Sequence, residues 1–227
     1  MGRDFRCAAS GRTRLAVGAV LLAAGASRRM GGADKLLLEV DGVPLVQRTC
    51  FALFAAGIDE VVVVRSHRAD HFEPLFSDFP VRVVRNEAPG ADRLASLRSG
   101  LEALPDDLDA IVVALADQPL LSAEDVVVLI GEFKRRHRGA VLVPEHRGVR
   151  GHPLIFESLL RPHVLATGMN LGTYDFIAAH PELVSTFDPG NDHYSFGLDT
   201  HEDVERLESR LLRGVVRWPR RLVVDVF

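Results

Sequence analysis

Short apolar runs rich in β-branched residues alternate along this chain with segments of helical spacing. Glu60 to Arg65 contains four successive valines, and Ala110 to Ala116 is a second apolar run of similar length. Strands that are covered on both faces have such continuous apolar sequences. Helical spacing is found over Leu45 to Ala56 and over Leu94 to Leu104. This alternation predicts an α/β fold in which a mainly parallel sheet lies between two layers of helices.

Further short elements fill the rest of the chain. Strands are expected over Ala19 to Ala23, Val81 to Arg85, Ala140 to Pro144, Leu154 to Phe156 and Val184 to Phe187. Helices are expected from an N-cap at Ser122 to about Arg136, over Tyr174 to His180, and from a cap at Thr200 through Leu212. No repeat or linker interrupts this order. We therefore predict one domain over residues 15–212, a disordered basic extension before it (1–14) and a tail of unassigned role after it (213–227).

The composition is ordinary for a globular protein and narrows the choice of partners. Of the 227 residues, 47% are hydrophobic and 26% are charged, which suits one substantial core. The net charge of −4 disfavours nucleic acid or a membrane surface as a general partner. Cys7 and Cys50 give no disulfide framework, the nine histidines show no zinc-binding spacing, and no apolar stretch reaches transmembrane length. The default expectation is a cytoplasmic protein.

The segment Leu22 to Lys35 gathers the residue types that bind oxygen-rich anions. It follows an apolar run and contains an isolated glycine, two arginines, a glycine pair and a lysine. Free backbone amides and flanking cations suit a triphosphate. Gly25 is followed by Gly31 and Gly32 without the Gly-Lys-Ser/Thr ending of a Walker A loop. The Gly-x-Gly-x-x-Gly fingerprint of dinucleotide sites is also missing from this segment.

A secretory signal peptide is an alternative interpretation of the same region. Arginines precede the apolar run, and Ala24 to Ala26 has the small residues of a cleavage site. Cleavage there would separate Arg29 and Lys35 from the apolar run, which also suits a first core strand. We therefore expect this run to be a strand.

The anion-binding segment reads Leu-Ala-Ala-Gly-x-Ser-x-Arg-Met-Gly-x-x-x-Lys and resembles the signature of the MobA-like nucleotidyltransferases. The resemblance implies a single Rossmann-like three-layer domain of the nucleotide-diphospho-sugar transferase type, with a mainly parallel, mixed sheet. It also implies an enzyme that uses Mg²⁺ to transfer a nucleotide from a nucleoside triphosphate to a phosphorylated acceptor, with release of pyrophosphate. The segment's expected nucleotide-binding residues are Leu22, Ala23, Ala24, Gly25, Ser27, Arg29 and Lys35, and Arg29 and Lys35 are also expected to be catalytic.

Two aspartates are candidates for the catalytic metal. Asp117 ends the apolar run of a buried strand, whose carboxyl end belongs at the same sheet edge as the loop. Because an unpaired buried carboxylate is costly, Asp117 is either a turn residue before Pro119 or a Mg²⁺ ligand. The resemblance implies that this Asp-x-Pro aspartate is catalytic and holds the metal. Asp199 opens Asp-Thr-His-Glu-Asp, which resembles a second family element with histidine in place of proline, and it is either a second metal contact or part of a helix cap.

Ser96 and His152 are further candidates for substrate contacts. The serine that matches Ser96 lies beside the nucleotide base in the family, although the segment alone also suits an ordinary helix start. Arg150 to Phe156 resembles a segment typical of the cytidylyltransferase branch, in which His152 could touch the acceptor phosphate or hydrogen-bond within its own loop. Met169 to Thr173 stands where relatives often have Gly-Asp-x-Gly-Ala-Arg near the acceptor, and this departure leaves the acceptor open.

The base and the acceptor are inferred from the same resemblance. In the family, Leu-Ala-Ala-Gly accompanies CTP and Leu-Ala-Gly-Gly accompanies GTP, and the methyl group of Ala24 would narrow the base pocket. The expected reaction is transfer of CMP from CTP to a molybdopterin-type molybdenum cofactor, which would serve a client molybdenum hydroxylase. The alternatives are GMP transfer to the same cofactor, nucleotidyl transfer to a sugar or polyol phosphate, and a non-catalytic chaperone that binds nucleotide or cofactor.

Overall fold

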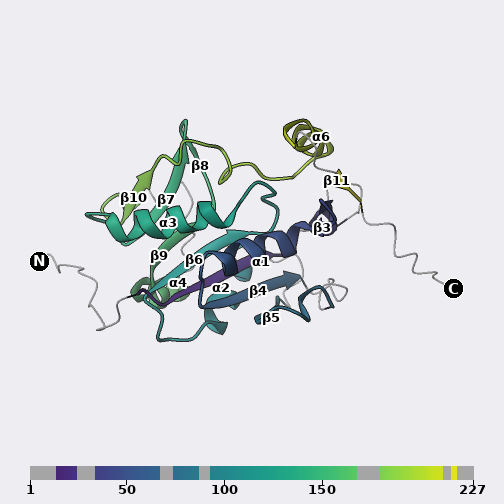
Figure 1. The fold of residues 1–227 in the computed structure, drawn as a ribbon. Helices are drawn as coiled ribbons and strands as arrows, with labels where there is room; N and C mark the ends of the chain where they lie inside the picture. Colours follow the sequence, from purple (N-terminus) through teal and green to yellow (C-terminus); the bar gives the residue numbers. More distant parts are fainter. Residues whose placement is uncertain are drawn as a thin grey trace, which may run out of the picture.

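A computed structural model of the chain describes residues 14–24, 34–66, 74–86, 93–167, 179–211 and 216–218. Its centre is an eight-stranded sheet with the order β10-β7-β9-β6-β1-β4-β5, in which β8 pairs with β7 (Figure 1). The strands are β1 Val17–Ala23, β4 Glu60–Ser66, β5 Val81–Asn86, β6 Ala110–Leu115, β7 Val141–His146, β8 Val149–Arg150, β9 Leu154–Glu157 and β10 Val184–Phe187. The predicted α/β fold class is confirmed.

The pairing of the strands decides where the loops meet. β1 runs parallel to β4 and to β6, and β4 runs parallel to β5. In this register Leu22 lies opposite Leu115, and Ala23 lies opposite Arg65. β9 is antiparallel to both β6 and β7, so the sheet is mixed, as predicted. The carboxyl ends of β1, β4, β5 and β6 therefore share one edge of the sheet.

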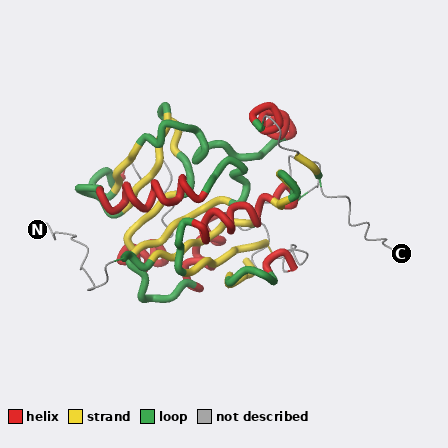
Figure 2. Tube along the Cα trace, in the orientation of Figure 1, coloured by secondary structure: helices red, strands yellow, loops and turns green. Residues whose placement is uncertain are grey.

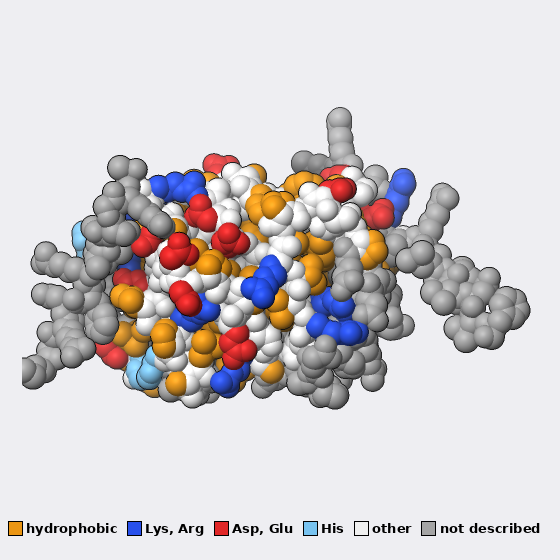
Figure 3. Space-filling model, turned by 90° about the horizontal axis from the view of Figure 1, so that it is seen from below, with side chains coloured by type: hydrophobic (Ala, Val, Ile, Leu, Met, Phe, Trp, Pro, Cys, Tyr) orange, Lys and Arg blue, Asp and Glu red, His pale blue; other side chains and the backbone are white. Residues whose placement is uncertain are grey.

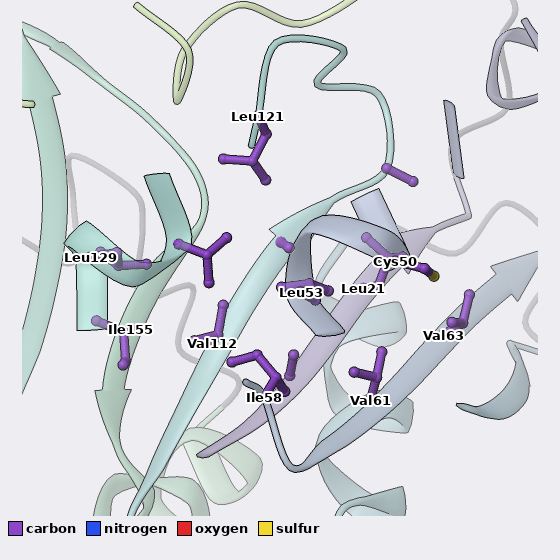
Figure 4. Close-up of a cluster of buried hydrophobic side chains, with 14 of the residues drawn as sticks. Leu21, Cys50, Leu53, Ile58, Val61, Val63, Val112, Leu121, Leu129 and Ile155 are labelled. Carbon is purple, nitrogen blue, oxygen red and sulfur yellow. The ribbon is translucent and has the colours of Figure 1, made fainter. Parts of the chain in front are cut away.

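Helices cover both faces of this sheet. They are α1 Leu45–Ala55, α2 Arg93–Ala103, α3 Ala123–Arg135 and α4 Arg161–Thr167, while α6 His201–Arg210 lies apart from these faces. Ala19 and Leu21 of β1 pack in the cluster formed with α1 and α3, part of which is drawn in Figure 4. Val20 and Leu22 point to the opposite face and pack in the cluster formed with α2 and α4. The alternation along β1 therefore produces the three-layer arrangement.

A smaller unit packs beside the carboxyl edge. It contains the three-stranded sheet β11-β2-β3 (β2 Glu39–Val40, β3 Val43–Pro44, β11 Val216–Arg217), the short 3₁₀ helix η2 (Lys35–Leu37) and α6. We call its apolar centre the third cluster. Its buried members are Leu38, Val40, Leu45, Phe196, Leu198, Val204 and Leu207, and Leu120, Leu211, Val216 and Trp218 pack against them. Leu38 and Leu198 within it are both completely buried.

The predicted elements agree with the structure, with a few corrections at their ends. Ser122 caps α3 with a full capping box, as predicted. Thr200 caps α6, but this helix ends at Arg210 and not at Leu212. The strands of two residues (β2, β3, β8 and β11) and η2 were not predicted, because they are too short to produce a period in the sequence. The predicted helix over Tyr174 to His180 lies almost entirely outside the described residues.

On the face of the molecule seen from below, the described residues form no large patch of a single charge sign. There, basic, acidic and hydrophobic side chains are interspersed (Figure 3). No helix within the described ranges is long and apolar enough to span a bilayer.

Candidate active site

The loops that follow β1 and β6 start next to one another. The backbone N–H of Ala116 donates to the carbonyl of Leu22 at 3.2 Å, which continues the pairing of β1 and β6 past the last strand residue. Ala24 and Asp117 therefore follow directly from two adjacent strands at the shared edge. This is the place where ligands bind in open α/β sheets.

Lys35 connects this edge to the small unit. Its Nζ donates to Asp117 Oδ2 at 2.6 Å, to the carbonyl of Leu198 at 2.7 Å and to Asp199 Oδ1 at 3.0 Å. The Lys35 side chain is 7% exposed, whereas that of Asp199 is 52% exposed. An ammonium group has three N–H donors, and each of these three oxygens lies within hydrogen-bond distance of it. The structure thus brings together three of the predicted site residues.

The environment of Lys35 keeps it charged. Burial of the ammonium lowers the pKa of Lys35, but the charge of Asp117 and the hydrogen bonds to Asp117 and Asp199 outweigh burial and raise this pKa above its usual 10.5. Lys35 is therefore a fixed positive charge between two carboxylates at any physiological pH.

Local sequence explains why these groups stay in place. Asp34 caps η2 by accepting a hydrogen bond from the Leu36 backbone N–H at 3.1 Å, and Leu36 is buried. Asp199 immediately precedes the Thr200 cap of α6, and its backbone N–H donates to Asp203 Oδ2 at 3.0 Å. Both Lys35 and Asp199 are thus held by the first turn of a short helix that packs in or beside the third cluster.

Asp203 completes the capping box of α6. Its partial burial raises its pKa, but hydrogen bonds from the Asp199 and Thr200 backbone and from the Thr200 hydroxyl, together with Arg206, lower this pKa below the usual 3.8. The carboxylate that caps the helix is therefore ionised at neutral pH.

Ser96 lies at the same edge of the sheet but on the β5 side. Asn86, at the end of β5, donates from Nδ2 to Ser96 Oγ at 2.9 Å, and both side chains are buried. The structure places Ser96 at the start of α2, as predicted, and adds Asn86 as its partner.

His152 lies in a tight connection between β8 and β9. Its backbone N–H donates to the carbonyl of Tyr194 at 2.7 Å, and the His152–Pro153 peptide bond is cis. A Cβ on the preceding Gly151 would stand 2.3 Å from the Tyr194 carbonyl oxygen, so only glycine fits there. This backbone contact joins the His152 loop to the distant segment around Tyr194, so it is not the hydrogen bond within its own loop that was one of the two predictions for His152.

The remaining predicted residues divide into two groups. Leu22 and Ala23 form the end of β1, with Ala24 directly after it. Gly25, Ser27 and Arg29 lie outside the described residues, as does the segment Met169 to Thr173.

Sequence reasoning missed several groups that position the site. Gln118 is 4% exposed and donates from Nε2 to the carbonyl of Tyr194 at 2.5 Å. The carbonyl of Leu198 binds Lys35, and a backbone acceptor leaves no trace in a sequence. Arg65 is 4% exposed and lies opposite Ala23, so a buried arginine is present at the same edge. The sequence signal that could have indicated the burial of Arg65 was its position directly after four successive valines.

Comparisons with known proteins place this chain in a family. The model of the MobA-like NTP transferase domain matches residues 19–183. A nicotine blue oxidoreductase from Paenarthrobacter nicotinovorans is 32% identical over 197 residues, which are 83% of this chain and 94% of that protein. A molybdenum cofactor guanylyltransferase from Burkholderia vietnamiensis is 37% identical over 115 residues. That second match spans 50% of this chain and 55%, or about half, of the guanylyltransferase.

Solved structures agree with this placement. A nucleotidyl transferase from Methanothermobacter thermautotroptrophicus superposes with a TM-score of 0.73 at 27% identity, over 87% of this chain and 98% of that one. Its fold is the nucleotide-diphospho-sugar transferase fold predicted from the loop signature. By its domain match, its relatives and its fold, the chain belongs to the MobA-like NTP transferase family and is a nucleotidyltransferase.

Proposed function

We propose that this chain transfers CMP from CTP to the phosphate of a molybdopterin-type cofactor and releases pyrophosphate. The observation that carries the proposal is the convergence of Asp117 and Asp199 on the Lys35 ammonium, at the edge where the anion-binding loop begins. Nucleotidyl transfer needs little covalent work from a protein and depends on positioning and on neutralisation of charge. Two carboxylates and a buried cation beside a triphosphate loop are suited to both tasks.

The same residues fit a divalent cation. Asp117 and Asp199 already share one cation, because both accept hydrogen bonds from the Lys35 ammonium. Within the described ranges, no three His, Cys, Asp or Glu side chains gather into a fuller ligand set. Mg²⁺ is satisfied with one or two carboxylates when substrate phosphates and water supply the other oxygens. Asp117 and Asp199 would hold Mg²⁺, which neutralises negative charge on the reacting phosphates when it is bound.

The protein's own groups would then orient the two substrates. The loop amides near Ala24 and the Arg29 guanidinium cradle the β- and γ-phosphates, and Lys35 adds a fixed positive charge beside them. Among the oxygens that Lys35 contacts at Asp117, Leu198 and Asp199, the half-exposed Asp199 carboxylate is the one that a phosphate oxygen would most readily replace. No general base is needed, since a phosphate nucleophile is already ionised.

The preference for CTP rests on Ala24 and on the segment Arg150 to Phe156. The alternative substrate is GTP, the nucleotide implied by the name of the guanylyltransferase relative. A preference for GTP would change the proposed contacts of the base but not the proposed roles of Lys35, Asp117 and Asp199. Transfer to a sugar or polyol phosphate stays a second alternative for the acceptor.

One assay tests the reaction and its alternatives together. Purified protein is given each nucleoside triphosphate, Mg²⁺ and either molybdopterin or a set of sugar phosphates, and pyrophosphate is measured. We expect release with CTP and molybdopterin. Nucleotide binding without release under any of these conditions would instead support the non-catalytic chaperone.

Asp117→Asn tests the proposed metal ligand in the same assay. It keeps the size of the side chain and removes its charge, so turnover should fall by about 100-fold or more, as when other transition-state contacts are removed. Asp106→Asn is the matched control, because Asp106 is a fully exposed aspartate that pairs with Arg161 away from the site. Near-normal turnover in Asp117→Asn would overturn the assignment.

One relative is named an oxidoreductase, so redox activity is tested in addition to pyrophosphate release. This chain lacks the Gly-x-Gly-x-x-Gly fingerprint after β1, which argues against a dinucleotide site there. Oxidation of NADH or NADPH with a dye acceptor is followed by absorbance at the same protein concentration. Redox turnover without any pyrophosphate release would overturn the proposed function.

A further inference from the structure

The segment from Asn191 to Asp199 supplies half of the site yet has no regular structure of its own. It runs from β10 to α6 as a loop (Figure 2) and contributes both the Leu198 carbonyl and the Asp199 carboxylate to Lys35. A helix or strand would fix these groups through its backbone ladder. Here their position depends on the packing of Phe196 and Leu198 in the third cluster and on individual hydrogen bonds, both within the segment and to its neighbours.

Two of these bonds come from consecutive residues of the β6 loop. The Asp117 carbonyl accepts a hydrogen bond from the Leu198 backbone N–H at 3.0 Å. Gln118 Nε2 donates to the Tyr194 carbonyl at 2.5 Å. The two contacts lie four residues apart on the segment, so together they set its register against the loop that carries Asp117.

The buried amide of Gln118 is only partly satisfied by hydrogen bonds within the described residues, which costs folding free energy. Its Oε1 is buried and accepts no hydrogen bond from any residue in the described part of the chain. The Tyr194 carbonyl also accepts a hydrogen bond from the His152 backbone N–H at 2.7 Å, so it would keep a partner without Gln118. An apolar side chain of the same length would therefore satisfy the fold at least as well.

We propose that Gln118 is a positioning residue that holds Asp199 opposite Asp117 and thereby sets the affinity of the site for a divalent cation. This inference rests on the proposed function, since it assigns Asp117 and Asp199 to the metal. Residues that orient metal ligands from behind commonly change metal affinity by about 10- to 100-fold when they are replaced.

Gln118→Met tests the proposal because it keeps the length of the side chain and removes its donor. Mn²⁺ binding in the presence of a non-hydrolysable CTP analogue is measured by electron paramagnetic resonance, together with amide hydrogen exchange and the melting temperature. We expect the Mn²⁺ dissociation constant to rise about 10-fold or more. Exchange should become faster at 194–199, while the melting temperature stays equal to that of the wild type or rises.

Asp192→Asn serves as the matched control on the same segment. Asp192 pairs with Arg210 at 2.8 Å and does not contact the Asp117 loop among the described residues. Its replacement should leave Mn²⁺ affinity unchanged. That result would show that the loss of Mn²⁺ affinity in Gln118→Met comes from the Gln118 hydrogen bond, and that loss of any other contact of the segment does not have the same effect.

Two results would overturn the positioning role. One is equal Mn²⁺ affinity in Gln118→Met and the wild type. The other is a lowered melting temperature with faster exchange throughout the domain, which would make Gln118 a packing residue. A wild-type protein that binds no Mn²⁺ while Asp117→Asn turns over normally would instead refute the proposed metal site itself.

Discussion

Lys35 connects two parts of the chain that are far apart in sequence. Its ammonium reaches Asp117 at the end of the central sheet and Leu198 and Asp199 in the loop before α6. The pKa of Lys35 is raised above 10.5, so its contribution to stability is fully present below that pH. It is lost only as the pH rises through the higher pKa of the folded state. Lys35 therefore does not titrate in the range in which the enzyme would be assayed.

Lys35→Met separates the role of the cation from the role of the carboxylates. The ammonium repels any second cation near Asp117 and Asp199, so its removal should leave Mn²⁺ affinity equal or higher. Turnover should nevertheless fall by about 100-fold, because a fixed charge that stabilises the transition state is lost. Pyrophosphate release and Mn²⁺ titration check the two effects. A parallel loss of metal binding would show that Lys35 acts mainly by holding the carboxylates together.

Ala24→Gly tests the choice of base. The methyl group of Ala24 is expected to narrow the base pocket, so its removal should admit a purine more readily. One methyl group in a pocket changes discrimination by about 10-fold or somewhat more. The ratio of kcat/KM for CTP to that for GTP should fall by this factor in Ala24→Gly. An unchanged ratio would assign the discrimination to residues elsewhere in the site.

At the scale of elements, the residue before the N-cap of α6 is Asp199, one of the two carboxylates proposed as metal ligands. Thr200 and Asp203 form a capping box, and the Asp199 backbone N–H donates to the same Asp203 oxygen. The order of this helix end and the position of Asp199 therefore depend on the same hydrogen bonds. α3 offers an internal comparison, since Ser122 and Asp125 form the same capping box there.

Thr200→Ala should weaken both the helix and the site. Loss of an N-cap side chain costs about 1 kcal/mol, which lowers the melting temperature of a chain of this size by roughly 2–4 °C. Ser122→Ala should destabilise the protein by a similar amount. Only Thr200→Ala should also raise the Mn²⁺ dissociation constant, and a calorimetric scan with a metal titration compares the two variants. Equal metal affinities would show that Asp199 is held independently of the cap.

Across the whole molecule, the sheet could be predicted and the assembled site only in part. The valine run of β4 and the apolar run of β6 have sequences that suit buried parallel strands, and this topology placed Lys35's loop and Asp117 at one edge. The segment that carries Asp199 has neither helical nor strand periodicity in its sequence. Asp199 was therefore identified only by its resemblance to a family motif. Its position depends on Gln118 and Tyr194, which are 76 residues apart, and on strands of only two residues. Contacts of this kind arise from tertiary packing and leave little trace in local sequence.

The third cluster has a thermal consequence. It holds Leu198 and the start of α6 in a small core of its own beside the main sheet, and small cooperative units open at lower cost than the whole domain. Trp218, the chain's single tryptophan, packs against this core. On heating, we expect tryptophan fluorescence and enzyme activity to change together, several degrees below the loss of far-ultraviolet circular dichroism. One shared transition for all three signals would contradict this. A protein built in this way would stop working while most of its backbone was still folded, and would recover on cooling.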